Sequence, residues 1–202
     1  PMGTVYTAEE LERVAAIVRD HDLFLIGDEV YKEFVYDGAA HKSVLELDDI
    51  QERVIVVDSI SKRYSCCGAR IGTVITRNPD LFQAILRFAQ ARLCPPTVEQ
   101  RAALAAYRMG LDYFKPVRQE YERRRDVLYE GLLSIPGVVA YKPQGAFYIT
   151  VKLPIKDSDH FVLWMLSEFN LEGETVMVAP AAGFYSTPGK GLDEVRIAYV
   201  LE

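Results

Sequence analysis

The sequence predicts an α/β protein, namely part of a mostly parallel three-layer sheet domain followed by a small α+β domain. Two apolar runs, Leu23–Ile26 and Val54–Val57, have the length and the branched side chains of buried parallel strands. Stretches with helical spacing flank these runs, as expected for a sheet covered by helices. After Pro136 and Gly137 the pattern changes to short strands around a single helix, which is typical of an α+β unit.

Residues 1–115 are expected to form the first domain. Thr7 followed by Glu10 predicts a capping box at the start of a helix that ends at Asp20. We expect strands at 23–27, 54–58 and 72–76. A helix that begins at Pro79 is ended by Pro95 and Pro96, and Thr97 is expected to cap the next helix, which ends at Gly110.

Residues 116–202 are expected to form the second domain, reached through a long charged helix from Asp112 to about Ser134. The arginines at 123–125 are interpreted as part of a solvated helix face, since charged runs on helices usually face water. In the rest of this domain we predict strands at 138–141, 146–151, 175–179 and 195–200 and a helix at 159–169.

Composition excludes several classes of function. The chain has 202 residues, half of them hydrophobic, and a net charge of −6, which argues against nucleic acid as a partner. It contains no apolar run near the roughly 20 residues that a membrane helix needs. Three cysteines make no disulfide framework, and no His/Cys cluster has metal-ligand spacing, so we expect a cytoplasmic protein without a metal. Cys66, Cys67 and Cys94 are interpreted as small packing residues, with a redox role as the alternative.

Lys62 lies just beyond the carboxyl end of a predicted strand, where open α/β sheets bind their ligands. Ser59 and Ser61 precede it, and Arg70 follows. A lysine amine can form an imine with an aldehyde, while hydroxyl groups and a guanidinium hold a phosphate. The segment is therefore suited to a phosphorylated aldehyde.

An acid and a phenol follow the neighbouring predicted strand, at Asp28 and Tyr31. Both strand ends should meet at one edge of the sheet. The combination with Lys62 fits pyridoxal 5′-phosphate, whose ring nitrogen needs an anion and whose ring oxygen accepts a hydrogen bond. Alone, Asp28 would be interpreted as a turn residue and Tyr31 as a half-buried core residue.

A set of motifs in a fixed order resembles the pyridoxal-phosphate-dependent aminotransferases of fold type I, class I/II, and most of all the aspartate aminotransferases. They are Asp28-x-x-Tyr31, Ser59-x-Ser61-Lys62, Gly68-x-Arg70-Ile71-Gly72, and the later stretches Gly145–Tyr148, Ala179–Phe184 and Val195–Ala198. The resemblance covers nearly all of the chain and implies a C-terminal half of a longer protein. Met2 departs from the family's Asn-Pro-Thr-Gly motif, while Pro1 and Gly3 match it.

The resemblance implies a role for each site residue. Lys62 is the catalytic lysine that binds the cofactor, Asp28 faces the ring nitrogen and Tyr31 the ring oxygen. Ser59, Ser61 and Arg70 contact the phosphate, although Ser61 has the alternative of only shaping the loop. Arg196 binds the substrate α-carboxylate through two parallel N–H donors of its guanidinium. The alternative is a strand-edge arginine paired with Glu194.

The resulting prediction is an enzyme that transfers an amino group between an amino acid, with aspartate as one candidate, and a 2-oxo acid. The alternatives are another reaction on the same scaffold (a lyase, a decarboxylase or a synthase) or a non-catalytic fragment. Members of the family are homodimers, so a homodimer is implied. We expect the isolated 202-residue chain to be inactive, because the family's other cofactor contacts lie upstream.

Overall fold

The computed structural model describes residues 2–200 and divides into two compact units. Val5–Lys115 form one unit, called here the sheet-edge unit. Residues 116–200 form the other, the C-terminal unit, and residues 2–4 belong to it as well.

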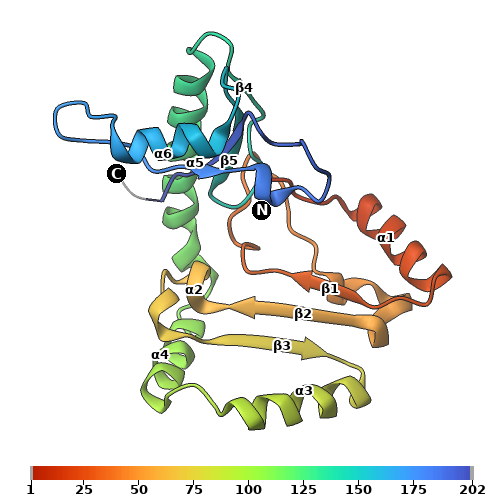
Figure 1. Cartoon of the computed structure of the whole chain (residues 1–202). Helices are drawn as coiled ribbons and strands as arrows, with labels where there is room; N and C mark the ends of the chain where they lie inside the picture. Colours follow the sequence, from red (N-terminus) through yellow and green to blue (C-terminus); the bar gives the residue numbers. More distant parts are fainter. Residues whose placement is uncertain (1, 201–202) are drawn as a thin grey trace. The chain divides into compact units, whose positions relative to one another are not determined.

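The sheet-edge unit is built on three strands, β1 (Leu25–Asp28), β2 (Val54–Ser59) and β3 (Gly72–Thr76), in the order β1-β2-β3 (Figure 1). β1 pairs with β2 in parallel, and β3 pairs with β2 in antiparallel orientation. The predicted strands are present, with the first beginning two residues later than expected. The described sheet therefore contains one parallel and one antiparallel pair.

One face of β2 packs against α1 (Ala8–Asp20) and two short 3-10 helices, η1 (Val44–Glu46) and η2 (Asp48–Arg53). The predicted capping box is confirmed, since Thr7 and Glu10 exchange side-chain to backbone hydrogen bonds. The core joins apolar side chains of all these elements: Leu11, Ala15, Val18, Val44, Leu47, Ile50, Val54 and Val56.

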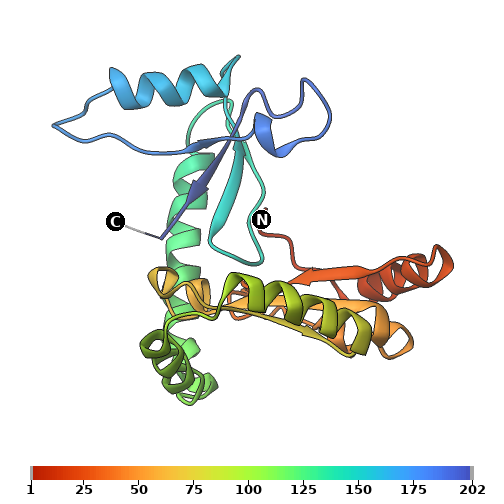
Figure 2. The ribbon, with the colours of Figure 1, turned by 60° about the horizontal axis from the view of Figure 1, so that its bottom comes forward.

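The rest of this unit follows β2 and β3. These elements are α2 (Ile60–Arg63), η3 (Cys67–Ala69), α3 (Pro79–Arg92), α4 (Thr97–Tyr107) and η4 (Leu111–Tyr113). The predicted cap at Thr97 is wrong: Pro96 occupies the N-cap position, and no side chain caps α4. Figure 2 shows α3 alongside β3, and α3 contains no buried residue; Phe88 is 78% exposed.

The C-terminal unit contains most of α5 (Phe114–Leu133) and a four-stranded antiparallel sheet in the order β4-β5-β7-β6. Its other elements are β4 (Val139–Ala140), β5 (Tyr148–Lys152), α6 (Ser158–Ser167), β6 (Ala179–Pro180), η5 (Ala182–Phe184) and β7 (Glu194–Ala198). The strand predicted at 175–179 begins only at Ala179. β7 lies inside the sheet, between β5 and β6.

The interpretation of all α5 arginines as solvated is wrong for Arg125, whose exposed fraction is 0%. Its guanidinium bonds the Asp126 carboxylate at 2.8 Å and donates from Nη1 to the Pro143 carbonyl oxygen at 3.0 Å. Lys142 also pairs with Asp126, at 2.9 Å. A buried arginine is tolerated here because a carboxylate and a carbonyl satisfy it.

The cysteines also differ from expectation, because Cys66, Cys67 and Cys94 are all exposed and free and do not fill a core.

Among residues 2–200, no helix has the length and apolar character needed to cross a membrane.

We predict that Arg125→Ala lowers the free energy of unfolding by about 2–5 kcal/mol, because the buried side chain would leave a cavity and the Pro143 carbonyl oxygen would lose its donor. Unfolding in urea would measure the loss. The control is Arg123→Ala, since the Arg123 side chain is 66% exposed and its ion pair with Glu120 lies at the surface; it should cost at most about 1 kcal/mol. Equal losses for the two variants would contradict the assignment of Arg125 as a structural centre.

Candidate active site

Strand register brings the predicted residues of the sheet-edge unit to one edge of the sheet. Asp28, the last residue of β1, pairs with Val57, and Ser59, the last residue of β2, pairs with Gly72. The Ile60 amide then donates to the Ile71 carbonyl oxygen at 3.3 Å. Asp28, the turn after Ser59 and the loop before Gly72 thus lie along the same edge, as the sequence predicts for a ligand site.

Lys62 is carried by the single helical turn of α2. The Ser59 hydroxyl caps this turn by accepting from the Ser61 amide at 3.0 Å, and the two serine hydroxyls are 2.8 Å apart. The Lys62 side chain is half-buried, and within residues 2–200 it has no hydrogen-bond or ion-pair partner. A half-buried amine without a carboxylate partner is chemically available to a carbonyl group.

The loop between α2 and β3 holds Arg70 in a left-handed backbone conformation, with φ of 55°. Such a conformation is uncommon for a residue with a side chain and is often found at functional sites. Arg70 is exposed, and its Nη1 donates to the Cys67 carbonyl oxygen at 2.8 Å. At Gly72 a Cβ would lie 3.1 Å from the Asp58 carbonyl oxygen, so glycine lets the loop approach the end of β2 closely.

Asp28 is exposed at the end of β1, and its carboxylate accepts a long hydrogen bond of 3.4 Å from the Val30 amide. Tyr31 is half-buried and contacts the Phe34 ring edge-on. The Asp28 carboxylate is therefore available to a positively charged ring nitrogen.

The next residue, Glu29, anchors this loop from the buried side. Its carboxylate accepts from the Ser43 hydroxyl at 2.8 Å and from the Val44 amide at 2.9 Å, and it lies 3.2 Å from His41 Nε2. Burial raises the pKa of Glu29, but the hydrogen bonds from His41, Ser43 and Val44 outweigh burial and hold the pKa below its usual range.

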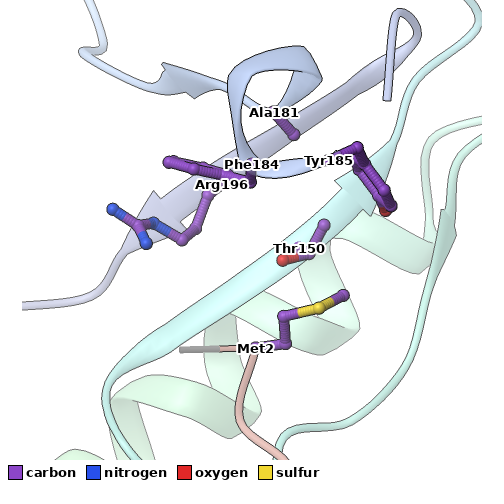
Figure 3. A pocket seen from close by; sticks show the side chains of 6 residues that line it. All are labelled: Met2, Thr150, Ala181, Phe184, Tyr185 and Arg196. Carbon is purple, nitrogen blue, oxygen red and sulfur yellow. The ribbon is translucent and has the colours of Figure 1, made fainter. Parts of the chain in front are cut away.

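Arg196 belongs to the C-terminal unit and lines a cavity of about 250 Å³ there. The other lining residues are Met2, Thr150, Ala181, Phe184 and Tyr185 (Figure 3). Phe184 lies beside Arg196, and Tyr185 lies on the other side of Thr150. Thr150 faces Arg196 directly across the β5–β7 pair, so the sheet register places both in the cavity wall.

The Arg196 guanidinium contacts two aromatic rings, with its carbon 4.3 Å from the Phe184 centroid and 4.6 Å from the Tyr148 centroid. These contacts leave the guanidinium N–H groups free, because within residues 2–200 Arg196 has no hydrogen-bond or ion-pair partner. An arginine with aromatic contacts and no acid is suited to an incoming carboxylate.

The alternative for Arg196, a pair with Glu194, is wrong. Glu194 instead accepts a short hydrogen bond from the Tyr185 hydroxyl, and this bond raises the pKa of the Tyr185 phenol. The Tyr185 ring lies so close to Gly191 that a Cβ there would come within 2.6 Å of it.

Sequence reasoning gave Tyr148 and Tyr185 no role, and it gave none to Phe184 as a side chain. The available signal was the alternation along β5, which places Tyr148 and Thr150 on one face. Phe184 and Tyr185 lie in η5 and the loop after it, where no periodicity predicts the direction of a side chain.

Comparison with known proteins assigns the chain to a protein family. A model of the family "Aminotransferase class I and II" matches residues 1–190, and the chain belongs to this family. The protein is therefore a member of the class I/II aminotransferases with the α/β fold of that family.

Two curated relatives illustrate the similarity. The aspartate aminotransferase of Bacillus subtilis (strain 168) is 32% identical over 208 residues, a match that covers 98% of this chain and 50% of the relative. The aromatic-amino-acid aminotransferase 2 of Thermococcus litoralis is 36% identical over 203 residues, with 98% and 50% covered. The chain thus spans about half the length of the curated relatives that it matches.

Solved structures agree with the fold. The structure called Pyrococcus protein-A1 superposes with a TM-score of 0.87 at 35% identity and covers 100% of this chain and 51% of that chain. The aspartate aminotransferase of Thermotoga maritima superposes with a TM-score of 0.84 at 28% identity, with 100% and 50% covered.

We predict that Glu29→Gln lowers the free energy of unfolding by about 1–3 kcal/mol at pH 7, because the amide cannot replace a hydrogen-bonded carboxylate. The folded-state pKa of Glu29 is lowered, so its contribution is complete above its ordinary pKa of about 4.3 and is lost as pH falls through the folded value. Urea unfolding of both proteins at several pH values should show the difference shrinking below about pH 4.

The control for this prediction is Glu9→Gln, because Glu9 is exposed and pairs only with Arg13. A Glu29→Gln difference that stays constant from pH 7 to pH 3 would contradict the role of its charge.

Proposed function

We propose that the protein transfers an amino group between an amino acid and a 2-oxo acid, using pyridoxal 5′-phosphate bound to Lys62. The observation that carries the proposal is the half-buried, unpaired Lys62 side chain at the sheet edge that Asp28 and the Arg70 loop share. Membership of the class I/II aminotransferases supports it.

The residues of this edge fit the cofactor. Arg70 is exposed, and Ser61 presents a hydroxyl group next to Lys62, so these two supply donors that a phosphate requires. The Ser59 hydroxyl donates to the Ile71 carbonyl oxygen at 2.9 Å in this structure and would turn from it to bind the phosphate. Asp28 supplies the carboxylate for a protonated ring nitrogen, and Tyr31 supplies a phenol for the ring oxygen. The bound cofactor would act as an electron sink that makes the substrate α-hydrogen acidic.

The chain's own groups then divide the remaining work. Lys62 Nζ is the group that would hold the cofactor covalently, and as a free amine it would accept and return the proton of the substrate α-carbon. Asp28 would keep the ring nitrogen protonated by staying ionised. Arg196 would hold the substrate α-carboxylate with two parallel N–H donors, since Tyr148 and Phe184 contact the guanidinium and no acid neutralises it.

The donor amino acid, the assembly and the compartment are parts of the same proposal. Relatives carry the names aspartate aminotransferase and aromatic-amino-acid aminotransferase, so aspartate and aromatic amino acids are the first donors to assay. We propose a homodimer, supported by large exposed apolar side chains such as Phe88 and Leu93, each 78% exposed. The three free cysteines support a reducing compartment such as the cytoplasm.

In the natural protein, Lys62→Ala should abolish both covalent attachment of the cofactor and turnover, because the other lysine near this edge within residues 2–200, Lys32, is paired with Asp58 at 3.0 Å. Borohydride reduction followed by peptide mapping checks the attachment, and an amino-donor assay checks turnover. Lys42→Ala is the control, since Lys42 pairs with Glu12 at 2.7 Å. Finding the reduced cofactor on Lys32 or Lys42 would overturn the assignment of Lys62.

Arg196→Lys should raise the KM for the amino acid by about 10- to 100-fold and leave the absorbance of the bound cofactor unchanged. The ammonium cannot form paired hydrogen bonds, and a charged hydrogen bond is worth about 1.5–3 kcal/mol. Steady-state kinetics with each donor measure the change, and Arg123→Lys on the exposed face of α5 is the control. An unchanged KM for every donor tested would remove Arg196 from the substrate site.

A further inference from the structure

A largely buried group of four charged side chains lies next in sequence to residues of the candidate cofactor site, and the proposed function does not use it. It consists of Lys32, Glu33, Asp58 and Arg63, called here the charged cluster. The exposed fraction of the side chain is 7% for Arg63, 4% for Asp58 and 13% for Glu33, and Lys32 is 28% exposed. All four belong to the sheet-edge unit.

Arg63 is the centre of the charged cluster. Its Nη2 lies 2.8 Å from Asp58 Oδ2 and 2.9 Å from Glu33 Oε1, and Lys32 Nζ also reaches Asp58 Oδ2, at 3.0 Å. The Arg63 guanidinium carbon lies 5.3 Å from the centroid of the Tyr107 ring of α4. One guanidinium thus joins β2, α4 and the loop after β1.

The positions of these residues in the chain give the cluster its importance. Lys32 and Glu33 follow Tyr31, in the loop that begins at Asp28. Arg63 follows Lys62 in the single turn of α2. The ion pairs therefore connect the segment that bears the ring acid with the segment that bears the amine. α2 is only one turn long: Ile60 anchors its first residue in an apolar core, and the Arg63 ion pair with Glu33 ties its last residue to the loop after Asp28.

Stability alone accounts poorly for this arrangement. Buried ion pairs contribute little net stability, because desolvation offsets their attraction. Arg63 Nε and Glu33 Oε2 are buried and have no hydrogen-bond partner within the part of the chain that the structure describes. Burial raises the pKa of Glu33, although Arg63 and Lys32 oppose the rise. Polar clusters with unsatisfied atoms cost free energy, and proteins keep them mainly at functional sites.

We propose that Arg63 is a positioning residue: held between Asp58 and Glu33, it locks the α2 turn to the loop after Asp28 and so fixes the direction in which Lys62 leaves the sheet edge. This inference rests on the proposed function for its catalytic consequence. Its structural part, that Arg63 controls the surroundings of the Lys62 amine, does not depend on the cofactor. Misplacement of a reacting group by about 1 Å can reduce a rate by about 100-fold.

The test uses two conservative variants of the natural protein. Arg63→Lys keeps the charge but cannot bridge both acids and stack on Tyr107, and Glu33→Gln keeps the shape but removes one ion pair. For each, kcat should fall by about 10- to 100-fold, while the KM for the amino donor changes by less than about 3-fold. The pH at which the absorbance of the lysine-bound cofactor changes should move by on the order of half a unit.

A second measurement uses protein freed of the cofactor. Acetic anhydride labels lysine amines, and mass spectrometry of peptides gives the rate at each lysine. The labelling rate of Lys62 should change several-fold in both variants, while that of Lys42 stays constant. Arg53→Lys is the matched control, because Arg53 lies at the opposite end of β2 and pairs with Asp22 at 2.5 Å; it should alter none of these quantities.

The outcomes separate the two proposals. If the natural protein binds the cofactor on Lys62 but the variants change neither the pH profile nor the labelling of Lys62, Arg63 has only a structural role and the inference is overturned. If no cofactor attaches to Lys62 in the natural protein, the proposed function fails, and the labelling rates still decide whether Arg63 governs that amine. Should Arg63→Lys fail to fold, Glu33→Gln gives the decision.

Discussion

The pairing of β2 with a parallel strand on one side and an antiparallel strand on the other determines where the polar groups of the sheet-edge unit lie. A parallel neighbour brings Asp28 to the carboxyl end of β2, and an antiparallel neighbour begins where β2 ends, so the Arg70 loop returns to the same edge. A register shift of one residue would turn each of these side chains to the opposite face. The apolar core between α1 and β2 prevents such a shift, because Val54 and Val56 would leave it.

Buried arginines connect loops to the regular elements in both units. Arg125 binds the Pro143 carbonyl oxygen, and the neighbouring amides of Gln144 and Gly145 donate to the Gly3 carbonyl oxygen. Arg63, at the end of α2, joins β2 and the loop after β1 through the carboxylates of Asp58 and Glu33. In each case a long side chain with several donors spans a gap that short apolar side chains could not fill. Burying the charge costs free energy, but the resulting contacts hold each loop in one defined position.

The free guanidinium of Arg196 contrasts with these two. Arg63 and Arg125 each have carboxylate partners, whereas Arg196 contacts two aromatic rings and lines a cavity. Aromatic rings stabilise the cation without neutralising it, so its attraction for a carboxylate is kept. The Tyr185–Glu194 hydrogen bond adds to this effect, because it engages the nearest acid in sequence elsewhere.

Local sequence patterns were enough to predict the order of the main elements and the polar residues that gather at one edge of the first sheet. Local signals were enough for these: the capping box at Thr7, the apolar run before Asp58 and the turn chemistry around Lys62 act within a few residues. Membership of the family, indicated by ordered motifs, is confirmed by the match to residues 1–190.

Which charged side chains are buried, and what they contact, depends on how distant segments pack against each other. Arg123 and Arg125 are two residues apart on one helix, yet one is exposed and the other is not, because only Arg125 faces the loop at Pro143. Arg63 pairs with Asp58, 5 residues away in sequence, and with Glu33, 30 residues away. Arg196 contacts Tyr148 of β5 and Phe184 of η5. Such contacts depend on the pairing of distant segments, which no local pattern of the sequence encodes.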